Sequence, residues 1–389
     1  MTATTLLPPA RAGDRLFTRA FVLLALGELA YLSADGMAVY LIPVYAEGPV
    51  GAGRAGAGLA FGAFALTALV LRPWAGRWSD ARGRRPLLVG GALLAAVSLQ
   101  LTPEVTSLIG LVGLRLVAGV GEAAVFTALF AAIADLAPAH RLGEALSYNS
   151  LALYLGLAAG PPVAELVIER WGFAVGWYVA AALALVAAVI FSVVPESCAC
   201  EHPDGRPPLI HRASVPVALG FLTSVIAMGG FLAFAALRAD ELGMRDTSVP
   251  LLVYGATVVL GRITVAKLVD RVPALRLGAA ALVTIGAGLG VAAAATSPAW
   301  LLIGTLLLGI GVTFSTPAFF SAIFALARPG ERGAASAMAS AALDLGLGIG
   351  PILLGYVAQA SGIPWAFATG AAVAGVGAVW TITRRAAAA

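Results

Sequence analysis

The sequence predicts an all-α membrane protein with twelve transmembrane helices arranged in two pseudo-symmetric six-helix halves. The 389-residue chain is 60% hydrophobic and 11% charged, whereas a soluble domain carries about 25% charged residues. Its apolar segments are continuous and close to the roughly 20 residues that a spanning helix needs. A helix motif also recurs 190 positions later, with Gly156, Gly160 and Pro161 repeated as Gly346, Gly350 and Pro351.

Only helices and closed barrels satisfy the backbone within lipid, and unbroken apolar runs favour helices. The expected spans are residues 20–45, 56–76, 86–102, 106–135, 144–168, 174–194, 214–238, 248–270, 276–295, 299–326, 334–359 and 365–383. Residues 1–194 and 214–389 are the predicted bundles, and residues 195–213 a cytoplasmic linker. The linker holds Cys198, Cys200, His202 and His211. A metal site is one interpretation, but a plain linker with reduced thiols and no metal is favoured.

Charged residues are scarce in this chain, and some of them also recur at the 190-residue offset. This recurrence strengthens the evidence for an internal repeat. Arg72 matches Arg262, and Asp80 matches Asp270. A duplicated helical bundle is a common architecture of transporters.

The basic residues predict the orientation of the chain. With the N-terminus inside, most of the 24 Lys and Arg residues fall on the cytoplasmic side, as the positive-inside rule requires. Both termini are therefore expected in the cytoplasm. The net charge of +4 follows from this topology and predicts no nucleic-acid partner.

A charged motif lies between the second and third expected spans. It reads Gly76-Arg77-Trp78-Ser79-Asp80-Ala81-Arg82-Gly83-Arg84-Arg85 and resembles the signature loop of the major facilitator superfamily, although Ala81 replaces a usual basic residue. A degenerate copy contains Asp270. An Asp at the inner end of a span can latch neighbouring helix ends in one state and release them in another, and a purely topological role is the alternative. The latch would comprise Gly76, Asp80, Arg82, Gly83, Arg84 and Asp270.

Two other segments carry the same resemblance. Arg115-x-x-x-Gly119-x-Gly121 is similar to a segment of the family's fourth helix. Gly156-x-x-x-Gly160-Pro161 resembles a segment associated with exporters and proton antiporters, although Ala164 and Glu165 replace its two final glycines. Small residues four apart allow close helix approach, and proline bends a helix. A deformable seam between the halves is expected from Gly156, Gly160, Pro161, Gly346, Gly350 and Pro351, with plain helix packing as the alternative.

Ionisable residues at bilayer depth cost roughly 2.5–3.5 kcal/mol each on insertion scales and therefore mark functional sites. The first span carries Glu28 and Asp35, and the fourth carries Arg115 and Glu122. Glu165 and Asp344 are further candidates, for which a structural role is favoured. At a rise of about 1.5 Å per residue, Asp35 and Arg115 lie at similar depths in the membrane, which suits a pair between them. The family resemblance implies that spans one, four, seven and ten line a central cavity, which would place this pair there.

These charges suggest proton coupling through Asp35, Arg115, Glu28 and Glu122. Burial favours a neutral carboxyl, whereas a nearby Arg favours the carboxylate, so separating Asp35 from Arg115 would let Asp35 take a proton. A permanent ion pair is the alternative. The expected substrate cavity, which favours a lipophilic or cationic compound, includes Tyr31, Phe126, Met228, Phe231, Phe314 and Asp344.

The combined expectation is a secondary transporter that exports small organic molecules in exchange for protons, resembling the drug–proton antiporter branch. A proton-coupled importer of a sugar, carboxylate or other metabolite is the main alternative, and a sensor without transport is a third. No P-loop motif is present, so no ATP, cofactor or enzymatic activity is expected. The arginine-rich, almost lysine-free composition suggests a bacterial inner membrane protein, and a monomer is expected.

Overall fold

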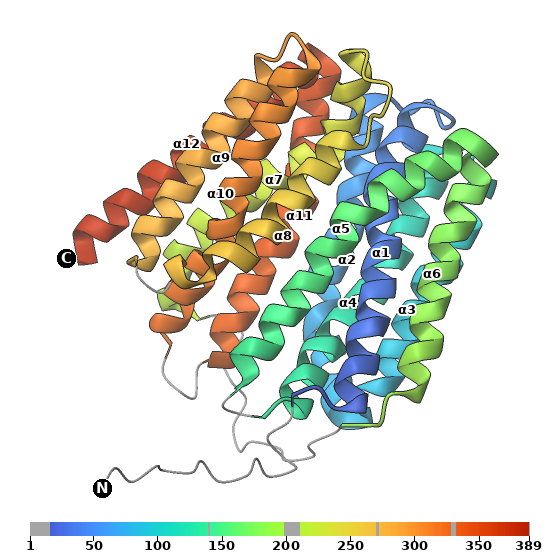
Figure 1. Ribbon diagram of the computed structural model, residues 1–389, viewed down its shortest axis with the longest axis vertical. Coiled ribbons are helices and arrows are strands. Elements are labelled where there is room, and N and C mark those ends of the chain that lie inside the picture. Colours follow the sequence, from blue (N-terminus) through green and yellow to red (C-terminus); the bar gives the residue numbers. More distant parts are fainter. Residues whose placement is uncertain (1–15, 139–140, 198–210, 270–271, 328–331, 389) are drawn as a thin grey trace, which may run out of the picture.

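The part of the chain that the structure describes folds into twelve long helices in two groups of six, which lie side by side in the computed structural model (Figure 1). The structure describes residues 16–138, 141–197, 211–269, 272–327 and 332–388. One half contains α1 (Arg19–Glu47), α2 (Gly53–Arg82), α3 (Arg85–Leu101), α4 (Leu108–Leu136), α5 (Leu142–Trp171) and α6 (Phe173–Val193). The other contains α7 (Val215–Glu241), α8 (Val249–Val269), α9 (Ala274–Ala293), α10 (Pro298–Ala325), α11 (Arg332–Ser361) and α12 (Ile363–Ala388).

Length and composition make these helices membrane-spanning. Across the described residues, eleven helices are long and apolar enough to cross a bilayer, and α8 is apolar over the shorter stretch Val249–Thr264. The all-helical, twelve-span prediction is confirmed. We call the face where α1 begins and α12 ends the terminal face, and the other the distal face.

The charged motif after the second span is helical rather than a loop, which corrects the expectation. Helix α2 continues through Gly76 and Asp80 to Arg82, and α3 begins at Arg85. The helix ends before Gly83, whose φ of 95° lies in the region that glycine adopts without strain. The turn between α2 and α3 therefore consists of Gly83 and Arg84 alone.

The halves meet along two pairs of helices. Helix α2 packs against α11, and α5 packs against α8, while the other extensive contacts lie within a half. Figure 1 shows α1 to α6, in blue to green, beside α7 to α12, in yellow to red. Because the two helix pairs are related by the internal repeat, the contact between the halves is itself pseudo-symmetric.

The repeated glycines do not form the seam between the halves, contrary to expectation. A Cβ atom at Gly156 would lie 2.6 Å from the carbonyl carbon of Leu32 on α1, and one at Gly160 would lie 2.4 Å from that of Gly36. In the second copy, Gly346 and Gly350 approach Val225 and Ile226 of α7 in the same way. These glycines, with Pro161 inside α5, therefore pack α5 on α1 and α11 on α7, within each half.

The seam is made by neighbouring small residues on the other helix face. A Cβ atom at Gly58 of α2 would lie 2.2 Å from the carbonyl oxygen of Pro351, and one at Gly62 would lie 2.2 Å from that of Gly348. On the other side, a Cβ atom at Gly255 of α8 would lie 2.5 Å from the Cβ of Ala158. Of the six residues expected at the seam, Pro351 thus contacts the opposite half through its carbonyl oxygen.

We expect Gly160→Ala to lower the free energy of unfolding by about 1–3 kcal/mol, because the added methyl group overpacks a backbone contact. Gly113→Ala is the matched control, since a Cβ atom at Gly113 would meet nothing within 4 Å. That change should stabilise the helix by up to about 1 kcal/mol. Denaturant unfolding of both variants in detergent measures the difference, and equal stabilities would refute close α1–α5 packing.

Candidate functional site

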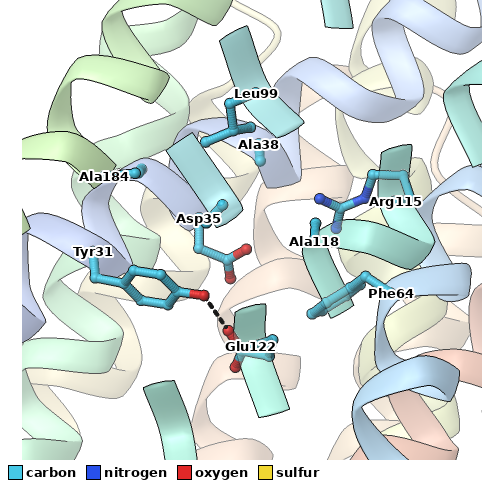
Figure 2. A pocket seen from close by; sticks show the side chains of 11 residues that line it. Tyr31, Asp35, Ala38, Phe64, Leu99, Arg115, Ala118, Glu122 and Ala184 are labelled. Carbon is cyan, nitrogen blue, oxygen red and sulfur yellow. Dashed lines mark hydrogen bonds between the residues drawn. The ribbon is translucent and has the colours of Figure 1, made fainter. Parts of the chain in front are cut away.

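A small polar cavity lies inside the N-terminal half. It is lined by side chains of α1, α2, α3, α4 and α6, among them Tyr31, Asp35, Phe64, Arg115 and Glu122 (Figure 2). Its volume is about 20 Å³, and one water molecule needs roughly 10–15 Å³ by the same measure. The cavity can hold a water or a transferred proton, but it is too small for an organic substrate.

Asp35 and Arg115 line this cavity from opposite helices. Figure 2 shows the Asp35 carboxyl on α1 and the Arg115 guanidinium on α4 turned toward one another. No nitrogen–oxygen distance between these two described side chains is within the 4.0 Å of an ion pair. The expected direct pair is therefore not formed in this conformation, although both residues share one cavity.

Arg115 is held by an aromatic ring. Its guanidinium carbon lies 4.6 Å from the centroid of the Phe64 ring, which is a cation–π distance. The side chain is 6% exposed, and its Nε has no hydrogen-bond partner among the described residues. This guanidinium is thus available to a charge that appears in the cavity.

Glu122 connects the cavity to a tyrosine. The Tyr31 hydroxyl donates a hydrogen bond of 2.9 Å to Oε2 of Glu122, as Figure 2 shows. Asp35 is one turn farther along α1, on the same face as Tyr31. With Arg115, four polar side chains from two helices therefore surround one water-sized space.

Glu28 lies apart from this group. It is 2% exposed, its Oε1 has no hydrogen-bond partner in the described part of the chain, and it does not line the cavity. It sits two turns before Asp35 on the same helix face, nearer the terminal face. The structure thus brings together Asp35, Arg115, Tyr31 and Glu122, but not Glu28.

The location of the cavity corrects the expectation of a central site. All of its lining residues belong to α1–α6, so Asp35 and Arg115 face the interior of one bundle rather than the space between the halves. Helix α1 is rotated this way because Gly36 on its other face packs against α5. The acids of the first span therefore do not support a cationic substrate.

An ion pair joins the two halves. Arg72 of α2 and Asp344 of α11 form a bidentate pair, through Nε to Oδ2 and through Nη2 to Oδ1 at 2.7 Å. The two side chains are 15% and 5% exposed, and the Arg72 guanidinium also lies over the Phe126 ring at 4.7 Å. Asp344 and Phe126 are expected in a substrate cavity, but here both contact the Arg72 side chain instead. Glu122, one turn from Phe126, is within electrostatic range of Arg72 and Asp344.

A second contact joins α5 and α8. Arg262 donates to the Tyr154 hydroxyl at 3.4 Å and lies over the Tyr154 ring at 4.6 Å.

The distal face is closed by further polar contacts between the halves. Glu165 accepts hydrogen bonds from Tyr40 of its own half and from Thr247 and Ser248 before α8. The structural role favoured for Glu165 fits these contacts.

The charged motif at the end of α2 forms a compact cluster at the terminal face. Arg84 donates to Asp80 at 2.6 Å and to Asp135 of α4 at 3.2 Å. The Glu196 carboxylate, after α6, accepts from the backbone nitrogens of Arg84 and Arg85 at 2.7 and 3.3 Å. The cluster therefore ties together the ends of α2, α3, α4 and α6, all in one half.

Arg84 is charged in this cluster. Burial opposes the charge, but the hydrogen bonds and charges of Asp80 and Asp135 outweigh it and raise the pKa of the Arg84 guanidinium above its usual range.

Other expected members of the latch lie elsewhere. Arg82 stacks over Trp78 at 5.1 Å, and a Cβ atom at Gly76 would meet only Thr127, at 3.9 Å. Asp270 lies outside the described residues, as do Cys198, Cys200 and His202.

The aromatic residues expected to line a cavity in the second half are mainly packing residues. Phe231 is fully buried and packs against the rings of Tyr254 and Phe367, with centroids 5.8 and 5.9 Å away. Met228 is also buried, and Phe314 is half-buried. None of the three lines the cavity described above.

Sequence reasoning missed the roles of Arg72, Tyr154 and Glu196. Arg72 and Asp344 are 272 positions apart, so no local spacing predicts their contact. A signal was present for Arg72, since a repeated Arg within an apolar segment needs a partner. Glu196 follows α6 without a recognisable motif, and its capping role depends on where α6 ends.

Comparison with known sequences identifies the family. A sequence profile of the Major Facilitator Superfamily matches residues 24–328 and, in an overlapping second match, residues 217–389. The chain belongs to the Major Facilitator Superfamily. It is therefore a multi-pass membrane protein and a secondary transporter of a family that does not consist of enzymes.

Bacterial members of the superfamily match nearly the whole chain. An uncharacterized MFS-type transporter of Burkholderia pseudomallei (strain 1106a) is 30% identical over 372 residues, covering 90% of this chain and 88% of the relative. One of Salmonella typhimurium is 26% identical over 361 residues, covering 90% and 92%. A solved mutant form of the nucleoside transporter NupG has a TM-score of 0.79 at 13% identity, covering 94% of this chain and 99% of that chain. That likeness shows the fold alone.

Proposed function

We propose that this chain is a proton-coupled antiporter that exports small organic molecules by alternating access. The observation that carries the proposal is the water-sized cavity with Asp35, Arg115 and Glu122 inside one half. Carboxyl groups buried beside an arginine at membrane depth are costly and mark proton or ion pathways. A cavity that admits a water but no substrate supports a site for protons.

We propose that the cavity is linked to the contact between the halves through Arg72. Glu122 lies within electrostatic range of Arg72, which pairs with Asp344 across the α2–α11 contact. An ionised Glu122 attracts Arg72 and weakens its pair with Asp344. A protonated, neutral Glu122 no longer attracts Arg72, so Arg72 pairs with Asp344 alone. Protonation of Glu122 therefore favours closure between α2 and α11.

The cluster at the terminal face gives the N-terminal half the rigidity that rocking requires. Arg84, Asp80, Asp135 and Glu196 tie four helix ends together within this half. In our proposal this cluster acts as a clamp inside one moving body, and the Arg72–Asp344 pair acts between the two bodies. The glycine contacts of α1 with α5 and of α7 with α11 support the same rigid halves.

We place the terminal face in the cytoplasm of a bacterial cell, with the chain in the inner membrane as a monomer. The basic residues of the motif at the end of α2 support this orientation by the positive-inside rule. The closed distal face would then seal the periplasmic side. Export is favoured over import by the resemblance of Gly156-x-x-x-Gly160-Pro161 to segments of exporters and proton antiporters.

Proteoliposomes that contain the purified protein and a pH-sensitive dye test the function. A panel of organic anions, cations and neutral compounds is added on one side with an imposed pH gradient. Antiport predicts proton movement opposite to that of at least one compound, which stops when a protonophore dissipates the gradient. Proton movement in the same direction as the compound would establish import by symport, and gradient-independent transport would refute proton coupling.

A further inference from the structure

The two copies of the repeat place an arginine at equivalent points of the two contacts between the halves. Arg72 on α2 corresponds to Arg262 on α8, and Asp344 on α11 corresponds to Tyr154 on α5, each 190 positions apart. In both copies the arginine contacts that second residue across the halves. The geometry of the pair is therefore conserved by the repeat, whereas its chemistry is different.

The two arginines differ in how their charge is balanced. Arg72 has the Asp344 carboxylate as a bidentate partner. Arg262 has only the neutral Tyr154 hydroxyl and ring, no acid lies within 4.0 Å of it among the described residues, and its buried Nε has no hydrogen-bond partner. A charge without a counter-ion at this depth is unfavourable. The ion pair with Asp344 explains the presence of Arg72 in the membrane, whereas no such pair explains Arg262.

The position of Arg262 suits a ligand. At 1.5 Å per residue it lies about 20 Å from the distal end of α8 and about 10 Å from the terminal end, so it is within the membrane-spanning part, on the terminal side of its middle. Substrate sites of such transporters lie at the midplane, between the repeats. Arg262 is half-buried and Tyr154 is 7% exposed. The Tyr154 hydroxyl accepts from Arg262 and donates to no acceptor in the described part of the chain, so its proton is available.

We propose that Arg262 and Tyr154 bind the carboxylate of an organic anion, and that this anion is the transported molecule. The guanidinium offers charge-assisted hydrogen bonds to a carboxylate, and the tyrosine hydroxyl offers one more. The ligand carboxylate takes the place that Asp344 occupies in the other copy. This inference rests on the proposed transport of small organic molecules but not on proton coupling, and it replaces a cationic substrate by an anionic one.

Stability without any ligand gives the first test. Arg262→Gln and Tyr154→Asp should each leave the unfolding temperature of the purified protein unchanged or higher. The first removes an unbalanced charge, and the second supplies the missing carboxylate. Arg72→Gln, the equivalent change in the other copy, should lower it because Asp344 loses its partner. A loss in Arg262→Gln as large as that in Arg72→Gln would show that Arg262 is structural and would overturn the proposal.

Binding of three matched probes gives the second test, in detergent and without a pH gradient. Benzoate, benzyl alcohol and benzylamine share a ring and differ in charge. We expect benzoate alone to raise the unfolding temperature of the wild-type protein. Its dissociation constant should rise at least about tenfold in Arg262→Gln, since a charge-assisted hydrogen bond is lost, and Tyr154→Asp should repel it.

Stabilisation by benzylamine alone, an equal benzoate effect in Arg262→Gln, or no effect of any probe would each overturn the anion site. Because these experiments contain no pH gradient, a result that overturns the anion site does not bear on proton coupling. Conversely, benzoate binding that depends on Arg262 in a protein without proton movement would support this site and refute the antiport mechanism.

Discussion

Asp35→Asn is expected to abolish gradient-driven transport in proteoliposomes, while exchange of labelled for unlabelled substrate across the same membrane continues. The amide has the size of the carboxyl group but cannot take or release a proton. Asp35 faces Arg115 and Glu122 of α4 and Tyr31 of its own helix, and apolar side chains of α2, α3 and α6 complete the cavity.

The matched control is Asp240→Asn. It makes the same chemical change at an exposed position near the distal end of α7, outside the cavity. Accumulation driven by the gradient should be unaffected in the control and fall to the level of protein-free liposomes in Asp35→Asn. Undiminished gradient-driven accumulation in Asp35→Asn would refute a coupling role for this carboxyl group and favour a structural one.

Breaking the pair between the halves is expected to have the largest effect on stability. Arg72→Gln or Asp344→Asn should each lower the free energy of unfolding by about 3–5 kcal/mol, because removal of one partner leaves a buried charge uncompensated. The pair is 15% and 5% exposed, so solvent screens it little. The double variant Arg72→Gln/Asp344→Asn should lose less than the sum of the two single changes, since neither charge remains.

A double-mutant cycle of denaturant unfolding in detergent measures this coupling. Arg77→Gln is the control, because Arg77 lies on the same helix and is exposed. It should change stability by less than about 0.5 kcal/mol, as surface substitutions usually do. Additive losses in the double variant, or single variants as stable as the control, would contradict an ion pair between α2 and α11.

The sequence was sufficient for the helices and the repeat, because both depend on composition and local spacing. It also selected Asp35, Arg115 and Glu122, since charges in apolar spans are rare enough to be informative. It could not give the rotation of α1, which depends on how Gly36 packs against α5. This rotation moved the expected central site into one half.

Contacts between distant segments explain the remaining differences. The Arg72–Asp344 pair and the Glu196 cap arise when separate helix ends meet in space. The repeat showed that Arg72 and Arg262 are equivalent, but only the fold shows that one has a carboxylate partner and the other a tyrosine. The proposed substrate class depends on that difference.

Protonation in the cavity of the N-terminal half is proposed to control contact between the halves. Distances between spin labels at Arg77→Cys on α2 and Ala337→Cys on α11, with Cys198 and Cys200 replaced by serine, test this coupling. In the wild-type background, acidification should shorten the distance, because protonated Glu122 leaves Arg72 to Asp344. In a Glu122→Gln background, whose amide neither ionises nor takes a proton, this response should be lost. A distance that is independent of pH in the wild type, or an unchanged response in Glu122→Gln, would contradict this coupling.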